Sequence, residues 1–391
     1  MIRTLTAFTG EIDDAEAAAA ELLEQLQSGE SLLKNSVAVV ACSTDFIDSG
    51  VIRAVGAALP FPVVGLTTAA SCVRGGMGSL ILSLMVLTSD DVSFAVGLTE
   101  PILSPDRALL SAAYEEAAAR LPGRPALILS FYPLSPQVTG AGGDFAVETM
   151  AAVSGGVPNF GLLPVVAADD FQNQTRIICG GEDYTDRYAF ILLEGAVDPV
   201  FYVGVMSSEK VLKDKGVITR AEGPLMYSVN DITTLEYMRR DLGLAVDANL
   251  SPSNMFPIII DWGDGAAPVM RAVYAFSAEG AAVCGAHVPQ GGILSVGRID
   301  RDEVVVSASR VLADIKAAEA RGGLLFFSCV ARLHVLDFDE RAEMEVVAAA
   351  LAQTETPYFF CYAGGEICPV DGPGGVLTNR AHNYTFIVLA L

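Results

Sequence analysis

Histidine, basic residues and long apolar runs are scarce in this sequence, and each shortage excludes a class of protein. Among 391 residues there are three histidines and seven cysteines, and no C-x-x-C pair occurs. Structural zinc sites are built from such ligands at close spacing, so none is expected. Dinucleotide-binding, Walker, nucleophile-elbow and H-E-x-x-H motifs are also missing. We therefore predict no metal and no cofactor.

Lysine and arginine number 24 against 47 acidic residues, which gives a formal net charge of −23. Nucleic acids and anionic membrane surfaces attract basic patches, so neither is an expected partner. The longest apolar runs, 80–87 and 386–391, fall short of the ~20 residues that span a bilayer. The N-terminus lacks the apolar core of a secretory signal. We expect a cytoplasmic protein with reduced cysteines and no membrane insertion.

Apolar residues are abundant and make up 52% of the chain. Short, nearly continuous apolar runs are typical of strands covered on both faces of a sheet. Eight such runs occur, at 37–43, 62–66, 80–87, 126–132, 188–195, 323–330, 358–364 and 384–391. Segments with helical periodicity lie between these runs. In one of them, Ser104 is the expected N-cap and Pro105 the first helical residue. The predicted fold class is α/β, with mixed, largely buried β-sheets covered by helices in two associated domains.

Three segments follow a similar order, which suggests internal β-α-β repeats. Each runs from an apolar strand that ends in a small polar residue, through a proline, into a second strand, a polar loop and a closing strand. The prolines are Pro62, Pro158 and Pro357. Gly65 and Gly161 each follow their proline by three residues, whereas Phe360 takes this place in the third segment. Chance similarity among crossover units is the alternative.

Polar side chains follow several of these strands, at the edge where open sheets with crossovers bind their ligands. The candidates are Ser43, Thr67, Thr68, Ser130, Arg332 and Glu366. Hydroxyl groups there can hydrogen-bond a small polar ligand. Roles in turns and caps are equally open to them.

Several motifs resemble, in order along the chain, those of the FIST family, which pairs a FIST N-terminal domain with a FIST_C domain. They are VVGLTTAAS, VPNFGLLPVVAADDF, GVITRAEGPLMYSVNDITTLEYMRRDLG, VPQGG, LLFFSCVAR and YFFCYAGGEICP followed by NYTFIVLAL. FSCVAR and GGEICP are the most specific pieces. On this resemblance we expect a FIST N-terminal domain over residues 1–222 and a FIST C-terminal domain over residues 223–391.

The resemblance implies a sensory module of intracellular signal transduction that binds a small polar ligand, with amino acids proposed as ligands. Many relatives are fused to kinase, chemoreceptor or cyclic-dinucleotide output domains. The sequence shows no such domain. We therefore expect a separate signalling output protein as partner.

Arg332 and Glu366 follow two apolar strands, and we expect both at one edge of a sheet. An arginine fork suits a carboxylate and a carboxylate suits an ammonium, so the pair would hold both ends of an amino acid. Gly365, beside Glu366, and Cys329, near Arg332, complete the predicted ligand-binding set. The alternative is that Arg332 and Glu366 form a structural ion pair with each other.

Two other functions stay open. Cys329 with a lowered pKa, His334 and Glu366 would make an enzyme of unknown substrate. A protein-interaction scaffold is the other possibility, and a large exposed apolar patch would favour it. Packing is the commoner role of a buried cysteine, and the sequence leaves enzymatic activity undecided.

Overall fold

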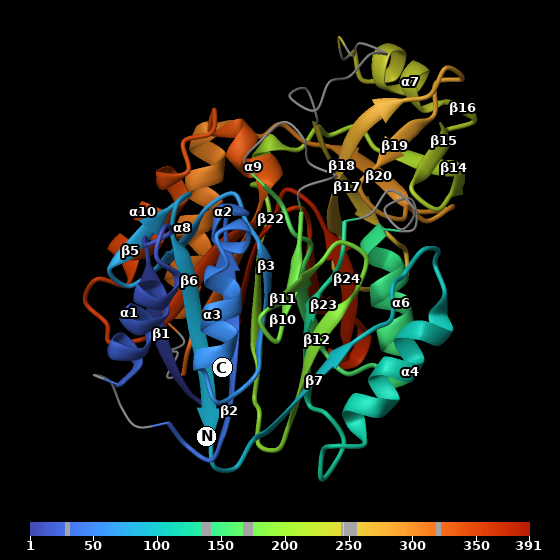
Figure 1. Cartoon of the computed structure of the whole chain (residues 1–391). Helices are drawn as coiled ribbons and strands as arrows, with labels where there is room; N and C mark the ends of the chain where they lie inside the picture. The colour runs from blue at the N-terminus through green and yellow to red at the C-terminus, as the bar shows by residue number, and fades with distance from the viewer. Residues whose placement is uncertain (28–31, 135–141, 167–174, 244, 246–255, 318–321) are drawn as a thin grey trace.

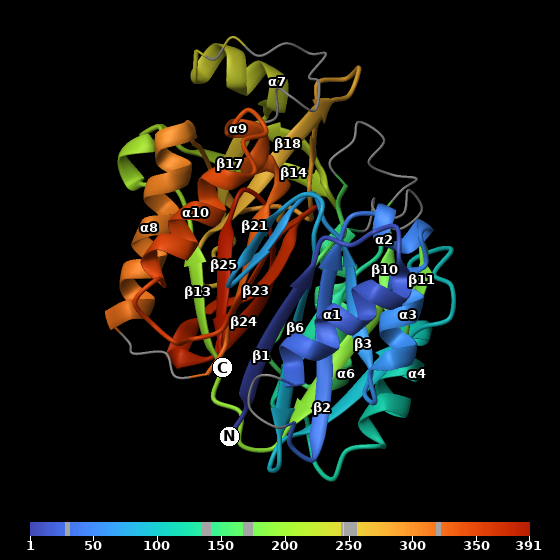
Figure 2. The ribbon, with the colours of Figure 1, turned by 60° about the vertical axis from the view of Figure 1, so that its left-hand side comes forward.

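The computed structural model describes residues 1–27, 32–134, 142–166, 175–243, 245, 256–317 and 322–391. It consists of three sheet-and-helix units and one inserted sheet (Figure 1). Both termini lie at one end of the molecule, and the inserted sheet lies at the other (Figures 1 and 2). No helix in the described part of the chain is long and apolar enough to cross a membrane.

Each unit repeats one order of elements: an outer strand, a helix, two parallel strands joined by helices, a hairpin and a closing strand. The first unit comprises β1 (Arg3–Thr9), α1 (Ala15–Gln27), β2 (Asn35–Cys42), α2 (Asp45–Asp48), α3 (Val51–Ala58), β3 (Val63–Thr67), β4 (Ser71–Val73), β5 (Gly76–Gly78) and β6 (Leu82–Ser89). The second comprises β7 (Ser93–Leu98), α4 (Arg107–Ala118), β8 (Leu127–Phe131), α6 (Gly142–Ser154), β9 (Asn159–Leu162), β10 (Ile177–Cys179), β11 (Glu182–Tyr184) and β12 (Ala189–Glu194).

The third unit has the same order, with the inserted sheet between its first strand and first long helix. It comprises β13 (Val200–Gly204), α8 (Arg301–Ala317), β21 (Leu324–Cys329), α9 (Val330–Val335), α10 (Arg341–Ala350), β22 (Tyr358–Ala363), β23 (Glu366–Asp371), β24 (Leu377–His382) and β25 (Phe386–Ala390). The eight predicted apolar runs coincide with eight of the central strands of the three units, and the α/β fold class is confirmed.

The hairpin of each unit pairs with the sheet of another unit. The three sheets have the strand orders β1-β6-β2-β3-β10-β11, β7-β12-β8-β9-β23-β24 and β13-β25-β21-β22-β4-β5. The first unit thus gives its hairpin to the third sheet, the second unit to the first sheet and the third unit to the second sheet. Because the exchange is cyclic, no unit has a complete sheet of its own.

Backbone hydrogen bonds confirm that the units are structural repeats. The N–H groups of Ala38, Ile128 and Leu324 donate to the carbonyls of Pro62, Pro158 and Pro357 at 2.9, 2.9 and 3.0 Å. At the other ends of the strands, Thr67, Leu163 and Tyr362 donate to Arg176, Gly365 and Ala70 of the exchanged segments, at 2.9, 3.0 and 3.1 Å. The prolines aligned in the sequence therefore occupy equivalent positions.

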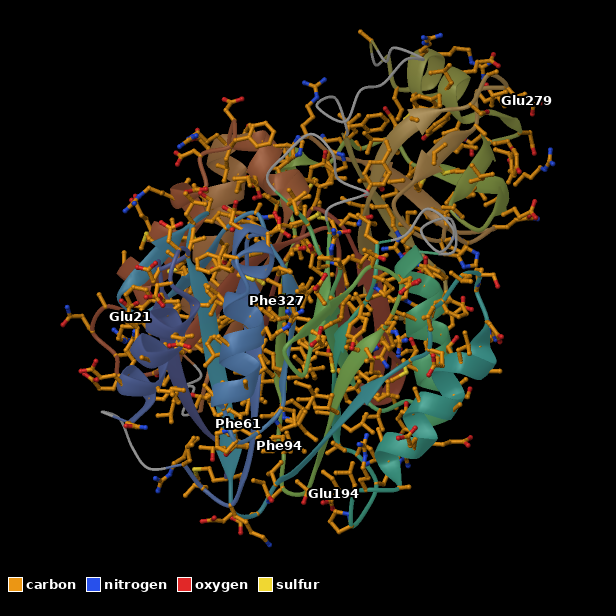
Figure 3. All side chains as sticks on the ribbon, viewed as in Figure 1. Glu21, Phe61, Phe94, Glu194, Glu279 and Phe327 are labelled. Carbon is orange, nitrogen blue, oxygen red and sulfur yellow. The ribbon has the colours of Figure 1, made fainter. Side chains whose placement is uncertain are left out.

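The inner faces of the three sheets share one apolar core, and helices cover the outer faces. Phe327 of the third sheet lies in the middle of the molecule, while Glu21, Glu194 and Glu279 lie at its margin (Figure 3). Phe327 stacks on Phe160 of the second sheet with ring centroids 4.8 Å apart. The outer faces pack against α1 and α3, α4 and α6, and α8 and α10 (Figure 2). Burial on both faces explains why the strands are continuously apolar.

One predicted helix start is wrong. The helix after residue 100 begins at Arg107, and its N-cap is Asp106, whose Oδ1 accepts a hydrogen bond from the Ala108 N–H at 2.9 Å. Ser104 and Pro105 lie before the helix. Aspartate is as good an N-cap as serine, so the local preference does not choose between the two starts.

Among the described residues, the inserted sheet has seven strands in the order β14-β20-β17-β18-β19-β15-β16. Its elements are β14 (Gly216–Glu222), β15 (Leu225–Val229), β16 (Ile232–Thr233), α7 (Thr234–Glu236), β17 (Phe256–Asp261), β18 (Val269–Phe276), β19 (Ala282–Cys284) and β20 (Ile293–Val296). The predicted domain boundary at residue 222 falls between β14 and β15, which pair with each other. That boundary stays a prediction.

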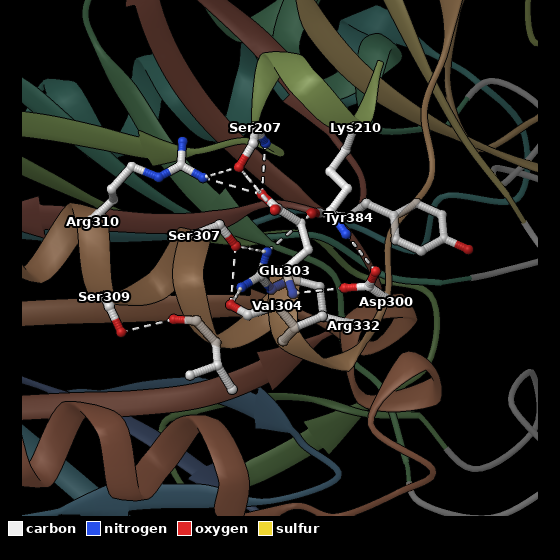
Figure 4. Close-up of polar contacts among 11 residues, drawn as sticks. Ser207, Lys210, Asp300, Glu303, Val304, Ser307, Ser309, Arg310, Arg332 and Tyr384 are labelled. Atoms are coloured by element: carbon white, nitrogen blue, oxygen red, sulfur yellow. Dashed lines mark hydrogen bonds and ion pairs between the residues drawn. The ribbon is translucent and has the colours of Figure 1, made fainter. Parts of the chain in front are cut away.

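Two connectors join the inserted sheet to the third unit, and side chains hold them together (Figure 4). The buried Glu303 carboxylate accepts hydrogen bonds from the N–H and hydroxyl of Ser207 at 2.6 and 2.8 Å, and pairs with Arg310 at 3.1 Å. Lys210 pairs with Asp300 at 2.6 Å. The outgoing and returning chains are thus fastened at the base of the inserted sheet.

Candidate functional site

The carboxyl ends of β21 and β22 lie beneath the inserted sheet and form the candidate site. Cys329 ends β21, Ala363 ends β22, and Glu366 begins β23 two glycines later. β18 of the inserted sheet docks on this end through Asn383, whose N–H donates to the Met270 carbonyl at 3.2 Å. The inserted sheet therefore lies against the strand ends of the third unit.

Glu366 is fully buried, and its two oxygens differ in their hydrogen bonds. Thr385 donates its hydroxyl to Oε2 at 2.8 Å, whereas Oε1 accepts no hydrogen bond from the described residues. The register places Ser71 and Ile177 at the equivalent positions of the exchanged hairpins in the other two sheets. A buried acid therefore stands where the other units carry a neutral side chain.

Three thiols surround this carboxyl group: Cys329, Cys361 and Cys368. Burial raises the pKa of each thiol, and the charge of Glu366 raises it further. Burial also raises the pKa of Glu366 well above its ordinary value of 4.5. Hydrogen bonds of the carboxyl group with the Thr385 hydroxyl and the Cys329 thiol, and the charge of Arg332, offset this rise in the pKa only in part. Burial thus favours the neutral form of the carboxyl group and of the three thiols.

The inserted sheet supplies a tyrosine to the same cluster. The pKa of Tyr274 on β18 is raised by its burial and then by Cys329 and Glu366. A Cβ atom on Gly285 would lie 2.8 Å from the Tyr274 hydroxyl, so glycine lets this part of the inserted sheet approach the phenol. The Asn383 side chain accepts a hydrogen bond from the Ala272 N–H at 3.3 Å. Tyr274 and Asn383 therefore form the cover over Glu366.

The structure places Arg332 in a different environment from the one expected. It is fully buried, and its partner is Glu343 of α10, at 2.7 Å, and not Glu366. Its remaining donors bind the Ser307 hydroxyl and the carbonyls of Val304 and Tyr384, at 3.1, 2.8 and 3.4 Å (Figure 4). Every guanidinium nitrogen has a protein acceptor. The alternative of an Arg332–Glu366 ion pair is wrong, because Glu343 takes that place.

The hydroxyl candidates lie in other parts of the fold. Ser43 hydrogen-bonds the Asp45 carboxylate at 2.8 Å, and the Thr67 hydroxyl accepts the Arg176 N–H at 2.9 Å. Thr68 donates to the carbonyl of Tyr362 at 2.8 Å and so links the first unit to the third. These hydroxyls are engaged by the protein, in the roles of turns and links.

Ser130, Gly365 and His334 complete the placement of the predicted residues. Ser130 hydrogen-bonds Asn159 and Tyr188, within the second sheet and away from Glu366. Gly365 stays beside Glu366, and a Cβ on it would lie 3.2 Å from the Asn383 amide. The His334 ring packs on Phe338 with centroids 4.6 Å apart, and burial lowers its pKa. Of the predicted set, Cys329, Gly365 and Glu366 come together.

Sequence reasoning missed Thr385, Asn383 and Tyr274. Asn383 and Thr385 directly precede the last apolar strand, at its amino end. Both residues precede a strand, so they were not among the polar residues that follow strands. Because β25 is antiparallel to β21, its amino end lies at the same edge of the sheet as the carboxyl end of β21. Tyr274 comes from the inserted sheet, whose strands were not predicted from the sequence.

Family comparison supports the resemblance seen in the motifs. The FIST N domain model matches residues 36–232, and the FIST C domain model matches residues 234–369. No curated protein matches the chain. Among solved structures, the crystal structure of a cyanuric acid hydrolase from A. caulinodans aligns over 100% of this chain and 99% of its own, at 8% identity and a TM-score of 0.38. A likeness this weak supports no inference about fold or activity.

Proposed function

Since the chain belongs to the FIST family, whose domains are signal-transduction sensors suggested to bind small ligands, we propose that it binds a small molecule through an amino group at Glu366. The ligand is an amino acid or a related metabolite. Cys329, Thr385, Tyr274 and Asn383 surround the bound group.

One observation carries this proposal: Glu366 Oε1 is buried without a hydrogen-bond partner in the described part of the chain. Leaving a buried polar atom unpaired costs about 1–3 kcal/mol, so a ligand that supplies a donor to this oxygen would recover that cost. An ammonium group offers three donors and a positive charge, which matches a carboxylate acceptor. The ammonium group of the ligand would donate the hydrogen bond that Oε1 lacks among the described residues.

The carboxylate end of an amino acid is not assigned to Arg332. All of its nitrogens already bind Glu343, Ser307 and backbone carbonyls. Recruiting it would break a buried ion pair, which costs about 3–5 kcal/mol. The amino group is therefore the recognised feature, and a free carboxylate on the ligand is not required.

Binding of an ammonium ligand releases a proton, which gives a direct test. The pKa of Glu366 is raised in the free protein, so the acid must lose its proton to form the ion pair. Calorimetric titrations in buffers of different ionisation enthalpy should show a buffer-dependent heat that corresponds to proton release. Affinity should rise with pH until Glu366 is ionised in the free protein.

The matched variants are Glu366→Gln and Glu345→Gln. Glu366→Gln should weaken binding by about 100-fold or more, because it removes the charge from a buried ion pair. Glu345 is an exposed glutamate on α10, paired with Arg341, and its variant should bind normally. Amine binding that is equal in both variants, or accompanied by no proton release, would contradict the proposal.

An enzyme using Cys329 gains no support from the geometry. Burial raises the pKa of this thiol, whereas a nucleophile requires it lowered. We also propose, from the family resemblance alone, a cytoplasmic location and a separate output protein. Affinity capture with and without ligand tests the partner, which should bind in one state and not in the other.

A further inference from the structure

A cavity of about 630 Å³ opens between β13, the β23–β24 hairpin and the inserted sheet. Its walls are mostly apolar side chains. They include Phe201, Val203, Met206, Met270, Val370 and Leu377. The volume and the composition are those of a pocket for a small molecule.

The cavity exists because the third unit departs from the repeat. At the equivalent corner of the first unit, the ring of Phe8 packs on the short β4–β5 hairpin, 3.3 Å from where a Cβ on Gly75 would lie. The strands of that hairpin have three residues each, whereas β23 and β24 have six each. The longer hairpin reaches past the corner to the inserted sheet, and Val203, smaller than phenylalanine, faces the space between them.

The cavity and the buried acid share one face of β23. Glu366, Cys368 and Val370 alternate along the strand, so their side chains point to the same side. Val370 lines the cavity, and Glu366 lies at the buried end of that row. The two sites are therefore neighbours along a single strand.

Two methionines connect the cavity with the cluster around Glu366. Met206 and Met270 line the cavity and also belong to the apolar cluster that contains Cys329 and Tyr384. Methionine side chains are unbranched and change rotamer easily, so they adapt to a ligand that passes between them. Rotamer changes of these two side chains would extend the cavity toward Cys329, whose thiol lies beside Glu366.

We infer that the ligand of the Glu366 site is an amphipathic amine, whose hydrocarbon body fills the cavity and whose ammonium group reaches Glu366. This inference rests on the proposed function, because it uses Glu366 as the anchor. The cavity adds the chemical class of the rest of the molecule. A strongly polar body would lose hydration in a pocket with these walls and gain few hydrogen bonds.

The test is a calorimetric series of butylamine, hexylamine and octylamine with the full chain, each below its micelle concentration. If the hydrocarbon enters the cavity, affinity should rise about fourfold for each added methylene group, the effect of burying one CH₂. Octanol, which has the same body without the charge, should bind more weakly than octylamine. Glu366→Gln should remove most of that difference.

Two variants narrow the cavity from different sides. Ala267→Trp acts at an exposed position on its rim, and Val203→Phe restores inside it the residue type of the first unit. Either should flatten the dependence of affinity on chain length, because it should weaken octylamine binding more than butylamine binding. Val306→Trp, at an exposed position of α8 away from the cavity, is the control. Ala267→Trp keeps the test decisive if Val203→Phe does not fold.

The outcomes separate the two claims. Equal affinity for the three amines, with binding still lost in Glu366→Gln, would overturn the inference and leave the proposed function standing. No amine binding at all would overturn both. Octylamine and octanol binding equally, without any loss in Glu366→Gln, would show a cavity that works without the acid and would also overturn both. A steep chain-length dependence that Ala267→Trp removes and Val306→Trp keeps would support the inference.

Discussion

Glu343 and Glu366 of the third unit are both fully buried, and their surroundings differ in one decisive respect. On the helix side of the third sheet, Glu343 accepts hydrogen bonds from Ser328 at 2.8 Å and from Arg332 at 3.0 and 2.7 Å. On the core side, Glu366 has one bond from Thr385 and no countercharge in contact among the described residues. Both side chains are fully buried. Burial therefore does not distinguish the two carboxyl groups, whereas their hydrogen-bond partners do, and the proposed binding role of Glu366 rests on that difference.

The largest effect should come from breaking the satisfied pair. Glu343→Gln leaves the Arg332 guanidinium buried without its countercharge, which should lower the free energy of unfolding by about 3–5 kcal/mol. Urea unfolding at neutral pH measures it. Glu345→Gln, on the same helix but in an exposed ion pair, should cost less than about 1 kcal/mol. Equal losses in the two variants would show that the buried pair contributes no more than the exposed one.

Glu366→Gln should raise the free energy of unfolding at neutral pH, whereas Glu343→Gln should lower it. Because the folded pKa of Glu366 is raised, its contribution to stability is fully present below the unfolded value and is lost as pH rises through the folded value. Each unit of the shift is worth about 1.4 kcal/mol. The variant should equal the wild type near pH 4.5 and exceed it as pH rises.

The measurement is the urea midpoint of both proteins at several pH values from 4.5 upward. If the urea midpoints of the wild type and of Glu366→Gln change with pH in parallel over the whole range, the pKa of Glu366 is the same in the folded and the unfolded protein. The comparison with Glu343 would then lose its meaning, because both carboxylates would be satisfied in the folded state.

The sequence predicted the central strands well, because strands covered on both faces are continuous apolar runs such as 323–330 and 384–391. It did not predict the inserted sheet. β14 alternates buried and exposed residues and has no such run, so it does not stand out from a loop. The cyclic exchange of hairpins could not be predicted either, because the residues of the β4–β5 hairpin, 71–78, do not indicate which sheet the hairpin joins.

Only some of the predicted site residues lie together in the structure, and the partner of Arg332 shows why. Arg332 and Glu366 both follow strands, so sequence order suggested one shared site. The side chain of Arg332, on α9, instead points to the helix side, where Glu343 lies eleven residues further along. Glu366 begins β23, whose alternation turns it toward the core. Which face a residue takes is set by the packing of the helix after β21, and that depends on contacts far apart in the sequence.

The smallest effect should come from the hydrogen bond between Thr385 and Glu366. Thr385→Val keeps the shape of the side chain and removes the donor to Oε2, which should cost about 0.5–1.5 kcal/mol. It should also raise the pKa of Glu366 further, since the Thr385 hydroxyl lowers it. Stability should therefore decline over a longer range of rising pH than in the wild type. Thr385→Ser, which retains the hydroxyl, should restore the wild-type pH profile; if it behaves like the valine variant, the loss is one of packing and the acid does not depend on this bond.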